Sequence, residues 1–310
     1  MRFAFLLLLL CGCSRDDPPV ALGGRTMGTT WSLKVYSPTY RTVSPSFVQT
    51  KIQHQLDEWE NILSHWRPDS AVSRFNASSS TDWISVPGEL VEVVELAQQI
   101  GNETDHALDI TLAPLIDLWG FGATGRREVP PTEAEIAKAK AQCGWQRLHT
   151  RHEPPALRKD IPELRINVSA VAEGWAMDKI ARQLELIELS NFLFEIGGEV
   201  LARGEWRVGV QTPAAPPGEA AHTLLLKNQS IATSGVYRQH FGAAGKEYSH
   251  ILDPRNGRPI EHSLESVTVV DDFAAQADGF ATALMVLGPK EGRRVAAQYH
   301  LNVVWFEHKK

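Results

Sequence analysis

The stretches of this chain that are typical of strands do not alternate one for one with those that are typical of helices. Short segments alternate apolar and polar residues, and longer segments repeat apolar residues every three to five positions. In the C-terminal half, the strand-like segments follow one another at spacings that suit hairpins. This order favours an α+β fold, with mixed or antiparallel sheets flanked by helices, over a doubly wound sheet.

Hydrophobic periodicity and end signals predict six helices. The third begins at a capping box that starts at Thr132 and ends at Gly144. The helices are expected over 46–63, 89–100, 132–144, 173–187, 274–287 and 289–300. Strands are expected over 29–37, 191–196, 206–211, 222–226, 266–270 and 302–306. Together they are expected to form a single large, two-lobed domain over 25–310.

Composition is that of an ordinary globular protein, with 310 residues, 43% hydrophobic and 22% charged. A chain of this length can bury a large core. Removal of a leader that contains Arg2 would change the formal charge from −6 to −7. Because no basic stripe remains, nucleic acid is not an expected partner.

The N-terminus reads MRFAFLLLLLCGC, an apolar run too short to span a bilayer. It predicts a signal peptide over 1–12, and Leu10-Cys11-Gly12-Cys13 resembles a bacterial lipobox with Cys13 as the lipid acceptor. A plain secretory signal is the alternative. Residues 13–24 are expected to be a flexible tether that leaves the domain lipid-anchored in the bacterial cell envelope, facing the periplasm. Cys143 is then the remaining thiol of the domain and is expected to be buried filler.

Glycine, hydroxyl, arginine, histidine and carboxylate residues crowd into 233–238 and 249–259. This mixture is typical of a loop built around a ligand. A lone histidine is more often structural, but His250 is the one histidine inside this dense motif, and histidine is the side chain whose reference pKa lies near neutral pH. We therefore treat His250 as a candidate general base, with Asp253 as the rival base or an orienting partner.

Asp278 and Thr282 are four residues apart on a predicted helix, so their side chains share one face. A carboxylate and a hydroxyl in this arrangement suit a hard cation, which prefers oxygen ligands. The spacing alone also fits a solvated polar face.

Several segments, in order, resemble one known family. The segments are Met27-Gly28-Thr29-Thr30, 63–76, 107–120, 167–178, Ile196-Gly197-Gly198-Glu199, 249–259 and 277–282. Over about residues 25 to 305 the chain is similar to the FAD:protein FMN transferases of the ApbE type. The resemblance implies the family's fold and a reaction in which FMN passes from FAD to a Thr or Ser hydroxyl of a target protein, releasing AMP.

The resemblance also implies a set of site residues. Mg²⁺ would be bound by Asp278, Thr282 and the backbone carbonyl of Ala170. The FAD contacts would be Met27, Trp66, Ala107, Leu108, Asp109, Asn167, Glu173 and Leu252. Two positions depart from the common family pattern, since Asn167 replaces the usual Asp and Glu173 stands where many relatives have Lys. The glycine pair after Ile196 is expected near the adenylate end.

Family targets are flavin-carrying subunits of redox-driven ion pumps and related extracytoplasmic reductases, so such acceptors are the expected partners, along with FAD and the membrane. Two other functions stay open on sequence grounds. One is hydrolysis of FAD to FMN and AMP, and the other is a lipoprotein that only binds FAD. A carrier would not need a metal at the scissile bond, so the Asp278 and Thr282 pair favours catalysis.

Overall fold

The computed structural model describes residues 19–36, 44–122, 125, 127–210, 222–236, 240–243 and 246–308. Its centre is a seven-stranded sheet in which every neighbouring pair is antiparallel, in the order β1-β2-β6-β7-β10-β15-β16. The strands are β1 (Val20–Thr26), β2 (Thr29–Val35), β6 (Phe192–Ile196), β7 (Glu199–Arg203), β10 (Ser230–Gly235), β15 (Leu264–Asp271) and β16 (Asn302–Glu307). This sheet and its flanking helices confirm the expected α+β class.

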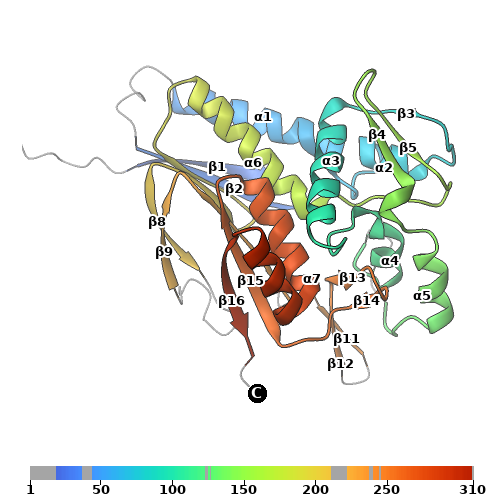
Figure 1. Ribbon diagram of the computed structural model, residues 1–310. Helices are drawn as coiled ribbons and strands as arrows, with labels where there is room; N and C mark the ends of the chain where they lie inside the picture. The colour runs from blue at the N-terminus through green and yellow to red at the C-terminus, as the bar shows by residue number, and fades with distance from the viewer. Residues whose placement is uncertain are drawn as a thin grey trace, which may run out of the picture.

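Three long helices cover one face of the sheet: α1 (Pro45–Leu63), α6 (Ser169–Leu186) and α7 (Ala274–Gln298) (Figure 1). The alternation in β2 explains why, because Trp31, Leu33 and Val35 are buried in the main core that these helices share. On the other side a hairpin of β8 (Glu205–Val210) and β9 (His222–Lys227) forms a smaller apolar cluster with the sheet. The sheet is therefore covered on both faces.

A smaller lobe lies beside α3 (Gly88–Glu103) (Figure 1). It contains a three-stranded sheet in the order β3-β5-β4 and several short helices. These elements are α2 (Ala71–Ala77), β3 (Ile84–Ser85), η2 (Ile110–Leu112), α4 (Ala113–Leu118), α5 (Glu133–Lys140), η3 (Trp145–Arg147), β4 (Leu148–Arg151) and β5 (Ala156–Lys159). The hairpins β11 (His240–Ala243) with β12 (Lys246–Ser249) and β13 (Leu252–Asp253) with β14 (Arg258–Pro259) complete the chain.

The predicted strands and helices are present with small shifts at their ends, but three expectations are corrected. Residues 20–24 are not tether, because β1 begins at Val20. Thr233, Ser234 and Gly235 are not in a loop, because they lie on β10. The helix expected from Glu173 begins at Ser169, so Ala170 lies in its first turn rather than before it.

The two C-terminal helices expected over 274–287 and 289–300 are two halves of α7 that meet at a kink. Gly288 has a φ of 76° there, and Pro289 follows it. Proline cannot donate the helical hydrogen bond, so the helix axis changes at this point. In the part of the chain that the structure describes, no helix has the length and apolar character needed to cross a bilayer.

Candidate functional site

Helices α6 and α7 meet at Gly174 and Asp278. The backbone N–H of Gly174 donates to Oδ2 of Asp278 over 3.4 Å, and the Asp278 side chain is buried. A Cβ on residue 174 would lie 2.5 Å from the carbonyl oxygen of Ala274, so only glycine lets the two helices come this close. Asp278, a predicted metal ligand, therefore lies at the crossing of the two helices.

Oxygen atoms gather around this crossing. In an α-helix the N–H of residue 174 faces the carbonyl of residue 170, so Asp278 lies close to the Ala170 carbonyl. Thr282 is one turn further along α7, and its Oγ1 is 3.0 Å from Oγ of Ser234 on β10. The structure thus places Asp278 against the first turns of α6 and Thr282 one turn further along α7, beside Ser234, which the sequence did not single out as a ligand neighbour.

This set of donors fits a hard divalent cation. One carboxylate, one hydroxyl and one backbone carbonyl are all oxygen donors, which Mg²⁺ prefers, and such a site leaves positions for phosphate oxygens. Among the described residues no group of three or more His, Cys, Asp and Glu side chains forms a metal cluster. Of the three proposed ligands, Asp278 supplies the carboxylate, Thr282 a hydroxyl and Ala170 a backbone carbonyl.

The N-terminus of α7 is capped by a side chain from α6. Oδ1 and Oδ2 of Asp178 accept hydrogen bonds from the backbone N–H groups of Ala274 and Ala275, over 2.8 and 3.0 Å. Phe273, the residue at the N-cap position itself, makes no side-chain cap. Burial raises the pKa of Asp178 to about 6, although the two backbone hydrogen bonds lower it. Sequence reasoning recognised Asp178 only as the end of a motif and missed this role.

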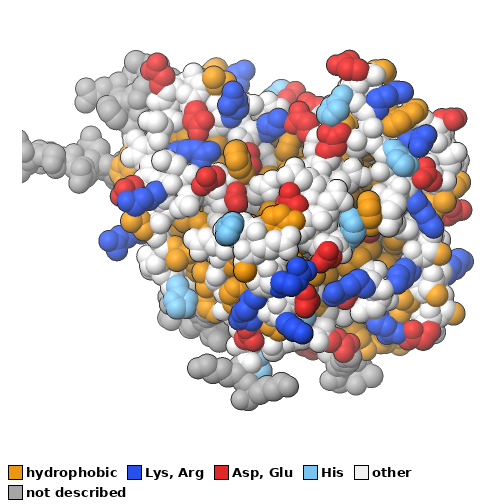
Figure 2. Space-filling model, in the orientation of Figure 1, with side chains coloured by type: hydrophobic (Ala, Val, Ile, Leu, Met, Phe, Trp, Pro, Cys, Tyr) orange, Lys and Arg blue, Asp and Glu red, His pale blue; other side chains and the backbone are white. Residues whose placement is uncertain are grey.

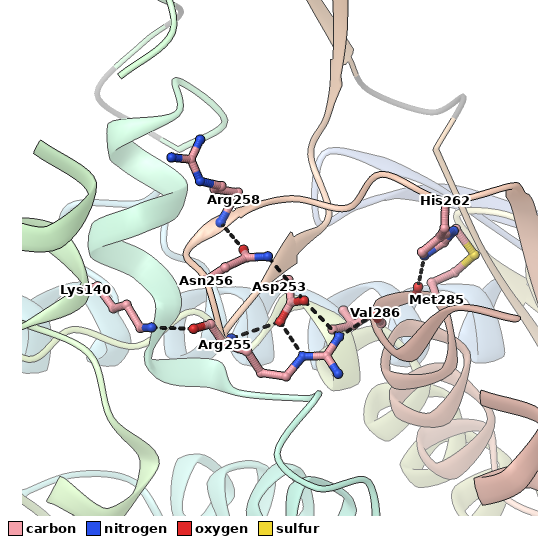
Figure 3. Close-up of polar contacts among 8 residues, drawn as sticks. All are labelled: Lys140, Asp253, Arg255, Asn256, Arg258, His262, Met285 and Val286. Carbon is pink, nitrogen blue, oxygen red and sulfur yellow. Dashed lines mark hydrogen bonds and ion pairs between the residues drawn. The ribbon is translucent and has the colours of Figure 1, made fainter. Parts of the chain in front are cut away.

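The other end of the first half of α7, which carries Asp278 and Thr282, is held by the segment after His250 (Figure 3). Nε2 of His262 donates to the carbonyl of Met285 over 2.7 Å, and the guanidinium of Arg255 donates to the carbonyl of Val286 over 3.3 Å. The backbone N–H of Leu264 donates to Nδ1 of His262, so the ring is the neutral Nε2–H tautomer. These donors satisfy carbonyls that the kink at Gly288 leaves without helical partners.

Asp253 is fully engaged inside the β13–β14 hairpin. Both of its carboxylate oxygens accept hydrogen bonds from the Arg255 guanidinium over 2.8 Å, and Oδ1 also accepts from the Arg255 backbone N–H over 2.9 Å (Figure 3). Trp119 of the small lobe donates from Nε1 to the carbonyl of Gly257 over 2.9 Å. The hairpin is thus fixed to both α7 and the small lobe.

A cavity of about 450 Å³ opens beside this hairpin, between it and Val286 and Leu287 of α7. Arg258, which lines this cavity, pairs with Glu133. Figure 2 shows basic and acidic side chains interspersed over the face of the molecule that carries this hairpin. The charges around the cavity are therefore mixed in sign.

His250 lies in the turn between β12 and β13 and is half-buried. Its ring approaches the edge of Phe121, with ring centroids 6.3 Å apart. It is three residues from Asp253, whose oxygens are occupied by Arg255, so the two candidate bases lie in different environments. Tyr237 and Arg238, which belong to the same motif, lie outside the described residues.

Three motifs that are far apart in the sequence meet at Gly197. A Cβ on this residue, whose φ is 61°, would lie 2.6 Å from Oε2 of Glu173 and 3.4 Å from the methyl group of Thr29. Met27 stands at the preceding turn between β1 and β2, with a φ of 48° and its backbone N–H 3.4 Å from Oε2 of Glu60. The predicted flavin contacts Met27 and Glu173 thus belong to one region.

Trp66 and Asn167 belong to a second region of predicted flavin contacts. Trp66 is 59% exposed, a large aromatic face that is free of the core. The neighbouring His65 ring is 5.0 Å from the Trp66 ring, and its Nδ1 is 3.4 Å from Oγ of Ser169, which donates to Oδ1 of Asn167. Burial lowers the pKa of His65. A planar ligand stacked on Trp66 would lie beside the start of α6, where Ala170 is located.

The segment Ala107–Leu108–Asp109 packs against α7 near Gly279. Ala107 and Leu108 are buried, and a Cβ on Gly279 would lie 3.4 Å from Cδ2 of Leu108. Oδ1 of Asp109 accepts from the backbone N–H and the hydroxyl of Thr111, over 2.8 and 2.6 Å, and so caps η2. Burial raises the pKa of Asp109, whose side chain lines a cavity of only about 10 Å³. In this structure Asp109 acts locally, as a cap.

Leu252 is buried in the small-lobe cluster with Leu115, Trp119 and Ile136. Leu115 and Trp119 are themselves almost fully buried and serve the core. Cys143 is buried in the same cluster, which confirms it as filler, and burial raises the pKa of its thiol to about 12. Cys13 and the rest of the leader lie outside the described residues, so the lipidation site stays a prediction.

Comparisons with known proteins agree over nearly the whole chain. The model of the ApbE family matches residues 27–305. The FAD:protein FMN transferase of Vibrio cholerae is 38% identical over 304 residues, which cover 96% of this chain and 90% of the relative. Among solved structures, the flavin transferase ApbE from Vibrio cholerae superposes with a TM-score of 0.85 and 36% identity, covering 94% of both chains. The apo flavinyl transferase ApbE of Pseudomonas stutzeri gives a TM-score of 0.84 and 33% identity, also over 94% of both chains.

Proposed function

The chain belongs to the ApbE family, and we propose that it transfers FMN from FAD to a threonine or serine hydroxyl of a target protein. The observation that carries this proposal is the α6–α7 crossing, where Asp278 reaches the Gly174 amide beside the Ala170 carbonyl and Thr282 follows one turn away. A site that only stored FAD would not need this set of oxygen donors at the scissile pyrophosphate. The chain is therefore an enzyme of the transferase class with FAD as its substrate.

The proposed metal at this crossing is Mg²⁺, bound by Asp278, Thr282 and the Ala170 carbonyl. When bound, it would neutralise charge on the pyrophosphate and orient its oxygens, which is what phosphoryl-type transfer mainly requires. The protein's own contribution is rigidity. Asp178 holds one end of the metal-bearing half of α7 and His262 and Arg255 hold the other, so Asp278 and Thr282 keep a fixed position.

His250 is the proposed general base. It would take the proton of the acceptor hydroxyl, whose oxygen forms a bond to the FMN-side phosphorus while the bond from that phosphorus to the bridging oxygen breaks and AMP leaves. We prefer His250 to Asp253 because both oxygens of Asp253 are occupied by Arg255. Asp253 instead orients the hairpin and Arg255, and through Arg255 it helps to hold the Val286 carbonyl of α7.

The flavin half of FAD is proposed to lie between the two regions of predicted contacts. Trp66 offers an exposed ring for stacking, and Met27, Asn167 and Glu173 offer polar and apolar contacts around it. Ala107, Leu108 and Leu252 are buried behind this site, so they shape it and support α7. Asp109 is proposed to shape the site through its cap on η2.

The proposed acceptors are flavin-carrying subunits of redox-driven ion pumps or of extracytoplasmic reductases. Lipidation of Cys13 would place the enzyme on the membrane of the cell envelope, facing the periplasm, where such subunits expose their domains. To test the function, the purified protein is incubated with FAD, Mg²⁺ and candidate acceptor domains, and the acceptor's mass is measured. A gain equal to one FMN, with release of AMP, is expected; unmodified acceptors with intact FAD would contradict the proposal.

A further inference from the structure

Exposed apolar side chains gather at one end of the molecule, remote from the candidate site. The described part of the chain contains nine large apolar side chains that are exposed. Four of them are Tyr36, Phe47, Leu186 and Ile187, with exposed fractions of 43%, 53%, 75% and 37%. Single exposed apolar residues are common on protein surfaces, whereas a group of them marks an interaction site.

The fold places these four residues together. Gln55 of α1 contacts Gln183 of α6, and Trp59 contacts Trp175, so the two helices run antiparallel. The start of α1, with Phe47, therefore lies beside the end of α6, where Leu186 and Ile187 are located, and Figure 1 shows both at the same end of the molecule. Tyr36 lies at the same end of the sheet, since its backbone N–H donates to the carbonyl of Asn191 in the connection that follows α6. Its ring packs against that of Trp206 of β8, with ring centroids 5.1 Å apart, on the other face of the sheet.

The first described strand, β1, begins at this same end of the molecule. Val20, the first residue of β1, pairs with Val35 of β2, and Val35 pairs with Phe192 of β6. Val20 comes only seven positions after Cys13, a length of chain that spans at most about 25 Å when fully extended. If Cys13 carries the lipid, the end of the sheet at Val20 cannot lie further than this from the membrane surface.

We propose that Tyr36, Phe47, Leu186 and Ile187, the membrane-facing patch, rest on the lipid surface and set the orientation of the anchored enzyme. This inference depends on the proposed lipid anchor but not on the transferase chemistry. Tyrosine is typical of lipid–water interfaces, and the Lys51 ammonium, 5.8 Å from the centre of the Phe47 ring, suits anionic headgroups. Glu185, an acidic neighbour, is paired with Arg203 over 2.6 Å.

The orientation has a consequence for catalysis. Ala170 and Leu186 are near opposite ends of α6, about 24 Å apart at 1.5 Å per residue. With the patch on the lipid, the α6–α7 crossing is held away from the membrane surface. The site then faces the side from which the extracytoplasmic domain of an acceptor approaches.

Spin labels on the lipidated full chain test this placement. Single nitroxides are attached at Leu186→Cys, at Phe47→Cys and, as a control, at Val129→Cys, which is 63% exposed just before α5 in the small lobe. Cys143 does not compete for the label, because it is buried and burial raises the pKa of its thiol to about 12. Vesicles of phosphatidylethanolamine and phosphatidylglycerol are then added, and collisions with oxygen and with a water-soluble nickel chelate are compared.

We expect the ratio of oxygen to nickel collisions to rise several-fold at residues 186 and 47 on vesicle binding, and to stay unchanged at residue 129. The contrary result is protein that floats with the vesicles while the labels at residues 186 and 47 stay as accessible to water as the control label. That result would overturn the proposed orientation. Failure of the lipidated wild-type chain to float would overturn the anchor and the orientation with it. Transfer of FMN to a soluble acceptor, measured on the same samples, reports the proposed activity separately.

Discussion

The carboxylate of Asp178 lies 2.8 Å from the backbone nitrogen of Ala274 and joins helix α6 to the first turn of helix α7. The same two helices carry the proposed metal ligands, Ala170 on α6 and Asp278 and Thr282 on α7. A carboxylate at a helix N-terminus also interacts favourably with the helix dipole. This contact therefore sets the register of one group of ligands against the other.

Asp178→Asn is expected to disturb the site without touching the metal. The amide can accept at one oxygen only, and its NH₂ group would face the second backbone N–H, which costs about 1–3 kcal/mol of stability. We expect a rise in the Mg²⁺ concentration needed for half-maximal transfer, with much of the maximal rate recovered at high Mg²⁺. Exposed Asp272→Asn is the matched control. An unchanged Mg²⁺ requirement in a less stable variant would show that Asp178 serves the fold alone.

The raised pKa of Asp178 leads us to expect a specific pH dependence of the free energy of unfolding. Its pKa is raised from 3.8 to about 6 in the folded chain, so the folded state keeps this proton where the unfolded state has lost it. This contribution to the free energy of unfolding is fully present below pH 3.8 and is lost as the pH rises through 6. Its size is on the order of 3 kcal/mol. Urea unfolding of wild type and Asp178→Asn at several pH values measures it; parallel curves for the two proteins between pH 4 and 6 would contradict it.

Asp278→Ala is expected to lose most transfer activity while the fold persists, because it removes the carboxylate among the proposed metal ligands and leaves the backbone of α7 intact. Partial recovery with excess Mg²⁺ or Mn²⁺ would support the role. Thr282→Ser, which keeps the hydroxyl near Ser234, is the mild companion variant. Mn²⁺ binding followed by electron paramagnetic resonance gives a readout independent of turnover. Wild-type transfer by Asp278→Ala in metal-limited buffer would exclude Asp278 as a ligand.

Cys13→Ser is expected to release the processed protein from the membrane fraction and leave the catalysis of the soluble domain unchanged. The reason is that residue 13 precedes every element of the fold, which begins with β1 at Val20. Fractionation of cells followed by activity assays on both fractions provides the measurement. A correctly processed Ser variant that stays quantitatively in the membrane fraction would show that Cys13 is not the anchor.

Periodic features of the sequence predicted much of the fold. The spacing of Asp278 and Thr282 placed them on one helix face but also fitted a solvated polar face, and the family resemblance singled them out. In the structure Asp278 lies against α6. β1 was misread as tether because Gly23 and Gly24 are typical of linkers. In the structure a Cβ on Gly24 would lie 2.6 Å from Nε1 of Trp31, so the glycine makes room for packing within the strand pair.

Contacts between distant segments were not predictable in the same way. Asp178 reaches Ala274 across 96 positions, and Ser234 reaches Thr282 across 48, so no local pattern signals either contact. Asp253 shows the opposite case, in which a residue noticed for its chemistry is fully occupied by its neighbour Arg255. Sequence identifies which residue types are present, but only the fold shows which of their atoms already have partners.

His250→Asn separates the proposed base from the metal site. If His250 takes the proton of the acceptor hydroxyl, the variant should transfer FMN roughly 10²-fold more slowly, in the range typical of a lost general base. FAD affinity should change little, because the proposed flavin and metal contacts lie elsewhere. Isothermal titration with FAD and a transfer assay give the two values. Equal transfer by variant and wild type would move the role of base to Asp253.

We propose that FMN is transferred to a protein hydroxyl at the α6–α7 crossing, rather than AMP being transferred or FAD being hydrolysed. Two preparations of FAD test it most directly, one radiolabelled in the FMN phosphate and one in the AMP phosphate, each incubated with wild-type protein, Mg²⁺ and an acceptor domain. We predict that label from the FMN phosphate becomes covalently attached to the acceptor, while label from the AMP phosphate is released as AMP in equal amount. Label from the AMP phosphate on the acceptor would contradict the proposed FMN transfer. So would label from the FMN phosphate that appears only in free FMN when a competent acceptor is present.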